Sequence, residues 1–338
     1  MSETRPNEIR WGIIGAGDVC EVKSGPAFNL VNKSRLVAVM RRNGQKAEDY
    51  AKRHKVQKWY DDADKLIHDP EVNAVYIATP PGSHADYTFK VAEAGKPVYV
   101  EKPMARTYKE CMAMVEACKK AKVPLFVAYY RRRLPNFLKI KELVDEGAIG
   151  DIRFVDVKLI KTLKPDIVGA SGSKENWRVF PEIAGGGYFY DLASHQLDYL
   201  DYLFGPIKGA KGYALNQAGL YPAEDIVSGS FVFENGVIGQ GIWCFTSSSV
   251  SDIEKTVIVG SKGQISFSYF GDGTVTLEKE GQKREVIPFM LPRHIQLPLI
   301  NTIVAELLGK GNCPSTGISG ARTNRVMEKL CERISIKG

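Results

Sequence analysis

The spacing of the apolar segments is the feature that most constrains the fold of this chain. In residues 1–127, short apolar runs rich in β-branched side chains alternate with stretches of helical periodicity. Five runs have the length of strands and cover residues 11–14, 36–40, 74–78, 98–100 and 125–127. Such alternation is typical of βαβ units and predicts a parallel, doubly wound sheet.

The pattern changes in the second half of the chain. Strand-like segments there are joined by turn signals such as Asn235-Gly236 and Lys262-Gly263, which predict successive hairpins. The segments cover residues 151–162, 209–216, 225–233, 237–245, 255–259, 264–269 and 274–278, and helices are expected at 188–203, 295–308 and 320–334. We therefore predict an α/β fold with a parallel sheet in residues 1–127 and a mostly antiparallel sheet in residues 128–338.

Length and composition exclude several classes of protein. A chain of 338 residues is longer than one core usually fills, since domains tend to have about 100–200 residues. No apolar stretch approaches the roughly 20 residues of a membrane span, and the polar N-terminus lacks a secretory signal, so we expect a cytoplasmic protein. The net charge of +7 is spread along the chain, which argues against a nucleic-acid partner. The six cysteines show neither C-x-x-C nor zinc spacing, so we expect reduced thiols and no metal.

A glycine turn follows the first predicted strand. The sequence Gly15-Ala16-Gly17-Asp18-Val19-Cys20 places Gly15 at a tight bend and Gly17 where a backbone can approach a pyrophosphate. The start of the next helix, at Asp18 and Val19, would add N–H donors for the phosphates. Cys20 occupies the third position, where Gly or Ala is usual, and it is small enough for helix–strand packing. The turn predicts a dinucleotide site formed by Gly15, Gly17, Asp18 and Val19.

The end of the second strand bears on the choice of dinucleotide. NAD-binding sheets usually place a carboxylate there, to accept the ribose hydroxyls, whereas an arginine accommodates a 2′-phosphate. This chain has Arg41 and Arg42 at that point and no carboxylate. Guanidinium groups bind phosphate through paired, charge-assisted hydrogen bonds. We therefore predict NADP as the cofactor, with NAD as the alternative.

Two further predicted strands end in polar or rigid turns. Ligands of open α/β sheets lie beyond the carboxyl ends of the strands, so residues in these turns are site candidates. A lysine in such a turn could bind a substrate oxygen and exchange a proton with it. The first turn contains Thr79, Pro80, Pro81 and His84, which could shape the nicotinamide pocket, and the second contains Glu101, Lys102 and Pro103.

A carboxylate and an imidazole follow three glycines in the second half. Gly185-Gly186-Gly187 permits close backbone approach before the predicted helix at 188–203. Asp191 and His195 are four residues apart, so on an α-helix they would share one face. We predict that these two side chains project together into a site, with loops at 161–172 and 188–190 adding further pocket residues.

Together these motifs resemble the Gfo/Idh/MocA family of NAD(P)-dependent oxidoreductases, which is named for glucose–fructose oxidoreductase and inositol dehydrogenase. The resemblance covers nearly the whole chain and includes Tyr130-Arg131-Arg132 and Trp177-Arg178. It implies an N-terminal Rossmann domain and a C-terminal α/β domain whose large open sheet often mediates oligomers, here a homodimer or homotetramer. It also implies that Lys102 is the catalytic lysine and that Asp191 and His195 bind the substrate and move its proton. Glu101 and Arg131 would contact the cofactor, and Tyr130, Trp177 and Arg178 the substrate.

The predicted reaction is hydride transfer between the nicotinamide and a CH–OH or C=O carbon of a sugar, cyclitol or related polyol. Whether Lys102 or His195 exchanges the proton stays open. The alternatives are reduction of a keto-sugar or dicarbonyl, oxidation of a dihydrodiol, and a non-catalytic NAD(P)-sensing protein. A short-chain dehydrogenase is excluded because no tyrosine is followed four residues later by lysine.

Overall fold

A computed structural model describes residues 6–163 and 176–332. The chain forms two compact units, and each is built from two separate segments. The first unit comprises Met1–Tyr130 and Pro292–Ala321, and the second comprises Arg131–Leu291 and Arg322–Gly338. The structure thus differs from a simple division after residue 127, because Pro292–Ala321 returns to the first unit. Most of the predicted pocket loop at 161–172 lies outside the described residues.

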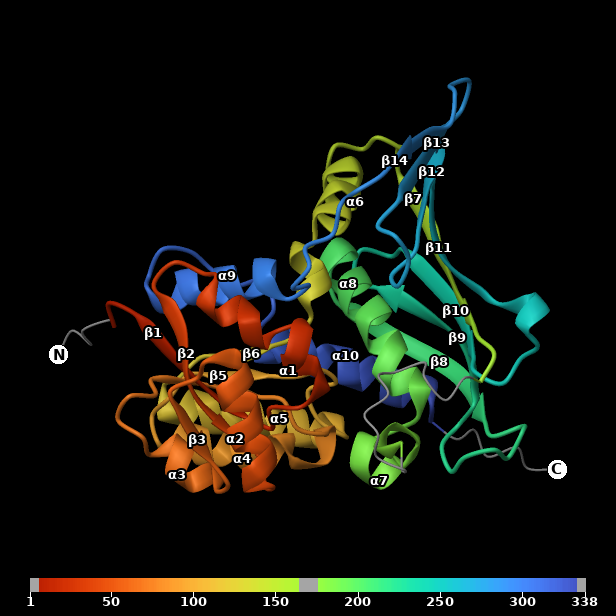
Figure 1. Ribbon diagram of the computed structural model, residues 1–338. Helices are drawn as coiled ribbons and strands as arrows, with labels where there is room; N and C mark the ends of the chain where they lie inside the picture. The colour runs from red at the N-terminus through yellow and green to blue at the C-terminus, as the bar shows by residue number, and fades with distance from the viewer. Residues whose placement is uncertain (1–5, 164–175, 333–338) are drawn as a thin grey trace. The chain divides into compact units, whose positions relative to one another are not determined.

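The first unit contains a six-stranded sheet in the order β3-β2-β1-β4-β5-β6, with every pair parallel (Figure 1). This strand order is that of dinucleotide-binding sheets. The strands are β1 (Ile9–Ile14), β2 (Ser34–Met40), β3 (Lys58–Tyr60), β4 (Ala74–Ile77), β5 (Val98–Val100) and β6 (Leu125–Val127). The sequence analysis missed β3, a three-residue edge strand with no fully buried position, so its apolar signal is weak.

Short helices connect these strands. They are α1 (Asp18–Val22), η1 (Gly25–Asn29), α2 (Gly44–His54), α3 (Ala63–Ile67), η2 (Pro81–Ser83), α4 (His84–Glu93) and α5 (Tyr108–Ala121), and α9 (Leu297–Leu307) comes from the returning segment. Helix α10 (Gly317–Leu330) begins in the first unit and ends in the second, and η3 (Tyr130–Arg133) spans the first of the three changes of unit along the chain.

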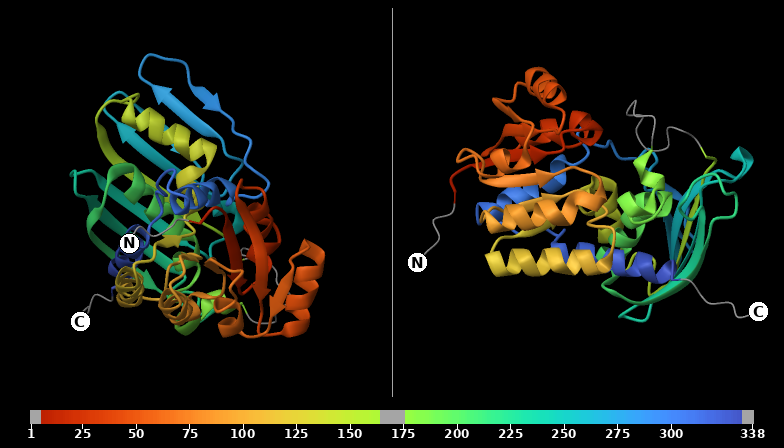
Figure 2. Two further views of the ribbon diagram at one scale, coloured as in Figure 1. Left: turned by 90° about the vertical axis from the view of Figure 1, so that its left-hand side faces the viewer. Right: turned by 90° about the horizontal axis from the view of Figure 1, so that it is seen from below.

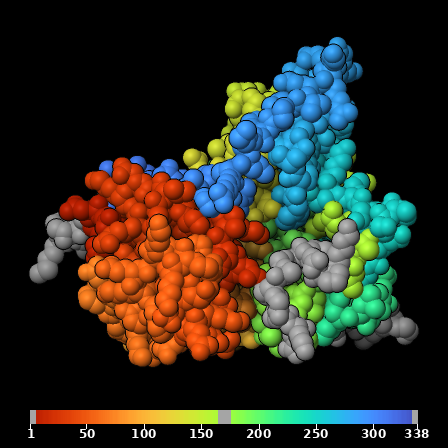
Figure 3. Space-filling model, in the orientation of Figure 1, coloured from red at the N-terminus to blue at the C-terminus, as the bar shows by residue number. Residues whose placement is uncertain are grey.

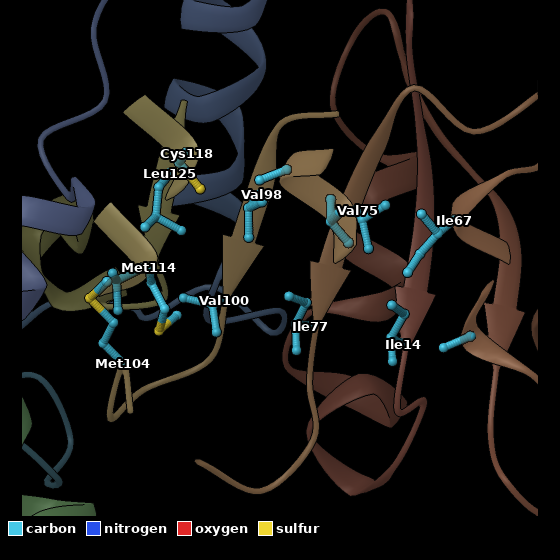
Figure 4. Packing of buried hydrophobic residues seen from close by; sticks show 14 of the residues in the cluster. Ile14, Ile67, Val75, Ile77, Val98, Val100, Met104, Met114, Cys118 and Leu125 are labelled. Atoms are coloured by element: carbon cyan, nitrogen blue, oxygen red, sulfur yellow. The ribbon is translucent and has the colours of Figure 1, made fainter. Parts of the chain in front are cut away.

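One face of the six-stranded sheet packs against α3, α4 and α5. Aliphatic side chains from neighbouring strands, such as Ile14, Ile77 and Val100, point to this face and are fully buried. Helix α5 contributes Met114 and Cys118 to the same cluster (Figure 4). Because all six strands are parallel, their carboxyl ends, and the loops that follow them, lie at one edge of the sheet.

The other face of the sheet is aromatic and is covered by the returning segment. The rings of Trp11 and Phe28 lie 4.8 Å apart, and those of Tyr76 and Tyr99 also lie 4.8 Å apart. Helix α9 lies on this side of the sheet, opposite α5 (Figure 2), and Gln296 at its N-terminus accepts a hydrogen bond from the Tyr99 hydroxyl at 2.7 Å. The returning segment thus adds to the cover of this aromatic face, together with Phe28 of η1.

The second unit contains an eight-stranded sheet in the order β14-β13-β12-β11-β7-β10-β9-β8. Every neighbouring pair is antiparallel except β7 and β10, which are parallel. The strands are β7 (Ile152–Ile160), β8 (Ile207–Leu215), β9 (Ile226–Phe233), β10 (Ile238–Cys244), β11 (Ile253–Gly260), β12 (Gly263–Phe267), β13 (Val275–Lys279) and β14 (Glu285–Ile287). The predicted fold class is confirmed, although the short strand β14 was not foreseen.

Helices α6 (Pro135–Asp145) and α8 (Ser194–Phe204) lie on one face of this sheet (Figure 1). The Tyr199 hydroxyl donates to the Phe137 carbonyl at 2.6 Å, and the Phe137 ring meets Phe267 of β12 edge to face. The remaining elements are η4 (Trp177–Val179), α7 (Pro181–Ala184), η5 (Phe189–Ala193) and η6 (Ser249–Ser251). The charged tip between β13 and β14 is exposed and stands out from the surface (Figure 3).

The predicted helix at 188–203 is not α-helical throughout. Residues Phe189–Ala193 form a π-helical turn, and α8 begins only at Ser194. Because a π-helix bonds i to i+5, the four-residue spacing of Asp191 and His195 no longer by itself places them on one face. The prediction of a continuous α-helix over 188–203 was thus wrong at Phe189–Ala193. Turns of π-helix inside helices are frequent at functional sites.

Among the described residues, no helix is long and apolar enough to cross a membrane. The same part of the chain shows no group of three or more His, Cys, Asp or Glu side chains that could hold a metal ion.

Candidate active site

The glycine turn has the geometry that its sequence requires. Gly15 has a φ of +86°, and a Cβ there would lie 2.6 Å from Cγ2 of Thr79 and 3.0 Å from the Thr79 nitrogen. At Gly17, by contrast, the atom nearest to an added Cβ would be the Gly15 oxygen, at 3.8 Å. The space beside Gly17 is therefore open, and a ligand could come close to the main chain there. Burial raises the pKa of the Cys20 thiol to about 12, which makes it an inert packing residue.

Arg41 and Arg42 follow β2 at the same end of the sheet. The Arg41 amide donates to the Tyr60 carbonyl at 3.1 Å, which fixes the backbone, and Asn43 caps α2 by accepting from the Lys46 amide at 3.0 Å. Arg41 is partly exposed and Arg42 is exposed. Neither guanidinium bonds to any residue within 6–163 or 176–332, so both are available to an external anion.

Lys102 lies in a turn supported by a buried carboxylate. The Glu101 side chain accepts hydrogen bonds from the Lys102 amide at 3.1 Å, from Nε2 of Gln296 at 2.6 Å and from the Tyr76 hydroxyl. Glu101 is only 7% exposed, whereas Lys102 is partly exposed. The sequence analysis expected Glu101 to contact the cofactor. In the structure, its buried carboxylate holds the turn that carries Lys102 through these hydrogen bonds. Sequence reasoning missed Gln296, which is 195 residues away and carries no local motif.

The neighbouring turn after β4 is tightly bonded. The Ser83 hydroxyl donates to Oγ1 of Thr79 at 2.8 Å and to the Pro80 carbonyl at 3.1 Å. His84 is fully buried, and its ring contacts backbone carbonyls of both this turn and the Lys102 turn. Thr79, Pro80, Gly82 and Ser83 of this turn are partly exposed, so a ligand can reach them, whereas Pro81, a predicted cofactor contact, is buried.

The second unit brings together the residues around Asp191. Arg178 Nε lies 3.5 Å from Oδ2 of Asp191, and the Arg178 guanidinium carbon lies 4.4 Å from the ring centroid of Trp177. The amide of Asn176 donates to the Tyr188 hydroxyl at 2.7 Å. Trp177, Arg178 and Asp191, which the sequence analysis assigned to the substrate, thus lie next to one another in the second unit.

The three glycines before this region are required by close contacts. Gly185 has a φ of +87°. A Cβ at Gly186 would lie 2.2 Å from the Tyr190 ring, and one at Gly187 would lie 2.8 Å from Cβ of Ala223. A larger side chain at Gly186 would therefore press on Tyr190 of the π-helical turn that carries Asp191.

His195 is 3% exposed and has an aromatic neighbour that sequence reasoning missed. The His195 ring meets the Phe270 ring at a centroid distance of 6.2 Å and an interplanar angle of 69°. The guanidinium carbon of Arg131 lies 4.6 Å from the Phe270 centroid, and Nε and Nη2 of Arg131 donate to the Tyr269 carbonyl at 3.0 and 2.9 Å. Arg131, predicted to contact the cofactor, thus holds the segment that contacts His195. Tyr130, a predicted substrate contact, is 8% exposed.

A parallel sheet in dinucleotide-binding order with a glycine turn, joined to a second unit that carries a buried Asp and His, defines a two-domain dinucleotide-dependent enzyme. The sequence pattern described as "Oxidoreductase family, NAD-binding Rossmann fold" matches residues 9–129, and that of the "GFO/IDH/MocA C-terminal domain" matches residues 137–266. The chain belongs to the GFO/IDH/MocA family and is an NAD(P)-dependent dehydrogenase.

Similar proteins extend over nearly the full length. Oxidoreductase P35 of Formosa agariphila is 40% identical over 325 residues, which are 96% of this chain and 99% of that protein. The scyllo-inositol 2-dehydrogenase (NAD(+)) of Bacillus subtilis is 28% identical over 91% of this chain and 88% of its own length. A structure of levoglucosan dehydrogenase in complex with NADH and levoglucosan has the same fold, with a TM-score of 0.82, 22% identity and 96% of each chain covered.

Proposed function

We propose that this protein is an NADP(H)-dependent oxidoreductase that transfers a hydride between the nicotinamide and a CH–OH or C=O carbon of a sugar, cyclitol or related polyol. The observation that carries the proposal is the position of Lys102. It is partly exposed at the carboxyl end of β5, and its amide donates a hydrogen bond to the buried Glu101 side chain. Relatives named for levoglucosan and scyllo-inositol support the substrate class.

The cofactor assignment follows from the first unit. The open space at Gly17 and the amides at the start of α1 fit a dinucleotide pyrophosphate, with Asp18 and Val19 beside it. Arg41 and Arg42 would hold the 2′-phosphate of NADP. A relative named for NAD(+) and a structure with NADH make NAD the alternative, which direct binding measurements decide.

The protein's part in the reaction is to bind the substrate and move its proton. The bound nicotinamide supplies the hydride acceptor or donor. In the oxidising direction the C–H hydrogen leaves with its electron pair, and the O–H proton passes to the neutral amine of Lys102 or the neutral ring of His195. In the reducing direction the same group returns the proton to the developing alkoxide, which its positive charge stabilises. Asp191, with its orientation limited by Arg178, would bind a neighbouring hydroxyl, and Tyr130 and Trp177 would contact the substrate.

Replacing Lys102 tests this function. Lys102→Met should lower turnover at least about 100-fold, the usual scale for an acid–base residue, with NADPH binding largely kept. Turnover is measured over a panel of sugars, ketoses, cyclitols, dicarbonyls and dihydrodiols, with NADPH binding followed by fluorescence. Lys90→Met, at an exposed lysine of the same unit, is the control. Near-normal turnover of Lys102→Met would refute the catalytic assignment, and cofactor binding without turnover by the wild type would favour a sensor.

The assembly expected from the family is a homodimer or homotetramer. The eight-stranded sheet exposes several large apolar side chains on β8 and β10, which are Tyr213, Leu215 and Ile238. Exposed apolar patches of this kind are typical of association surfaces. Light scattering of the purified protein measures the oligomeric state.

A further inference from the structure

His84 contacts backbone acceptors through both of its ring nitrogens. Nε2 lies 2.7 Å from the Thr79 carbonyl oxygen. Nδ1 lies 3.1 Å from the Met104 carbonyl oxygen and 3.2 Å from that of Pro103. The side chain is fully buried at the start of α4, so these carbonyls take the place of water around the ring. One ring thus joins the turn after β4 to the turn after β5.

The chemistry of these contacts selects one protonation state. A neutral imidazole has one N–H donor and one nitrogen lone pair, whereas an imidazolium has two donors. All three neighbouring oxygens are carbonyls, which only accept. Either neutral tautomer would therefore direct a ring lone pair at a carbonyl oxygen within 2.7 to 3.2 Å, and only the imidazolium bonds at both nitrogens.

The surroundings of His84 contain both opposing and favourable influences. Burial is the largest influence and lowers the pKa of the ring, and the carbonyls of Thr79, Met104 and Pro103 and the negative charge of Glu101 oppose it only in part. The assignment of a charge therefore rests on the carbonyl acceptors at both ring nitrogens and not on the pKa. Glu101 at the end of β5 is itself buried. The N-terminus of α4 disfavours a cation, and Asp86 in its first turn offsets this.

We propose that His84 is a positioning residue that, as a buried imidazolium, holds the Thr79 turn and the Lys102 turn in a fixed relation. The inference rests on the proposed function, because that function makes Lys102 the catalytic lysine and places Thr79 beside the nicotinamide. Thr79 is in close contact with Gly15, so the link extends to the glycine turn. Lys102 is then held from two sides, through its own amide by Glu101 and through Pro103 and Met104 by His84.

The charge of His84 is measured on the wild-type protein. In a sample with ¹⁵N-labelled histidine, the two ring nitrogens of an imidazolium resonate close together, whereas those of a neutral ring are widely separated. The chain has five histidines. The His84 signals are assigned by elimination with variants of the other four, which are His54→Gln, His68→Gln, His195→Gln and His294→Gln. We expect two N–H signals of the imidazolium type at pH 7, and a neutral ring would overturn the proposal.

The positioning role is tested with two isosteric variants. His84→Asn keeps an amide donor near the Nδ1 position, and His84→Gln keeps one near Nε2, so each preserves one link and breaks the other. Each should lower kcat/KM about 10-fold or more, the scale for losing a hydrogen bond from a charged group, and should remove the ionisation of His84 from the pH profile. His68→Gln, at an exposed histidine that also contacts a backbone carbonyl, is the control and should leave both unchanged.

The outcomes separate this inference from the proposed function. Folded His84 variants with wild-type kcat/KM and an unchanged pH profile would refute the positioning role, even if their thermal midpoints fell. Failure of the wild type to bind NADPH or turn over any substrate would refute the proposed function and leave the imidazolium result standing. If neither variant folds, the nitrogen spectrum of the wild type still decides the charge.

Discussion

Arg41 and Arg42 are the residues on which the choice of cofactor depends. Removing both by Arg41→Ala and Arg42→Ala should weaken NADPH binding about 10- to 100-fold, the scale for charged hydrogen bonds, and change NADH binding little, because NADH has no 2′-phosphate. Fluorescence titration gives both dissociation constants. Lys46→Ala, an exposed cation on α2, is the control. An equal loss for the two cofactors would assign the arginines a structural role.

A second residue-scale prediction concerns Glu21 and pH. Glu21 accepts hydrogen bonds from Arg53 at 2.7 and 2.8 Å and contacts His54, and chiefly because of Arg53 its pKa falls from 4.5 to about 2. A carboxylate with a lowered pKa in the folded state stabilises the protein above its unfolded pKa, and this stabilisation is lost as pH falls. The difference in free energy of unfolding between wild type and Glu21→Gln should therefore be constant above about pH 5 and shrink toward pH 2.

Urea titrations at several pH values measure this difference. Arg53→Ala removes the main cause of the shift, so in the Arg53→Ala background the effect of Glu21→Gln should lose most of its dependence on pH. A difference that stayed constant down to pH 2 would contradict the prediction.

The sequence shows some site residues and hides others for a physical reason. Lys102, Gly15 and Gly17 follow strands directly, so local patterns place them at the carboxyl edge of the sheet. Gln296 and Phe270 reach Glu101 and His195 only through tertiary packing, and no local spacing marks them. Their roles could be found only from the folded chain.

At the scale of elements, a buried ion pair anchors α8. The Arg132 guanidinium donates to both carboxylate oxygens of Asp198 at 2.8 and 2.7 Å, and both side chains are almost fully buried. Arg322 of α10 makes a similar contact with Asp201, the next carboxylate on the same helix face. The helix that begins just before His195 is thus fixed to η3 and to α10.

Asp198→Ala should lower the free energy of unfolding by about 3–5 kcal/mol, because it leaves the Arg132 charge buried without its main partner. Asp145→Ala breaks the exposed pair with Lys141 and should cost less than about 1 kcal/mol. Urea unfolding measures both. Similar small losses for the two variants would show that water replaces the lost carboxylate at Arg132.

Strands with buried apolar runs were predicted well, including the three-residue strands β5 and β6, whereas polar or irregular elements were not. The strands with continuous apolar runs, such as β2 and β4, are close to their predicted positions. The edge strands β3 and β14 have no buried residue, and neither strand is a continuous apolar run. The π-helical turn at Phe189–Ala193 has an apolar spacing that an α-helix also fits, so hydrogen bonding rather than sequence distinguishes the two.

At the scale of the whole molecule, the two compact units are not continuous stretches of the chain, because each is built from two separate segments. The sequence predicted the helix α9 but not its place, because its apolar side chains would suit any uncovered sheet face. In the structure, Leu299, Ile300 and Ile303 are fully buried within the first unit, more than 160 residues beyond its first segment. The Val127 amide donates to the Ser315 carbonyl at 3.2 Å, which joins the end of the same returning segment to β6.

The stability of the cofactor-binding sheet should therefore depend on α9. Ile300→Ala should cost about 2–5 kcal/mol, the range for a fully buried isoleucine, and the loss should appear in the first unit. Thermal or urea unfolding measures the loss. Bound NADPH stabilises the unit that binds it, so the unfolding transition that moves when NADPH is added belongs to the first unit. Ile253→Ala, at an exposed position of β11, is the control and should leave that transition in place. A loss of stability confined to the transition that NADPH does not shift would show that α9 supports the second unit instead.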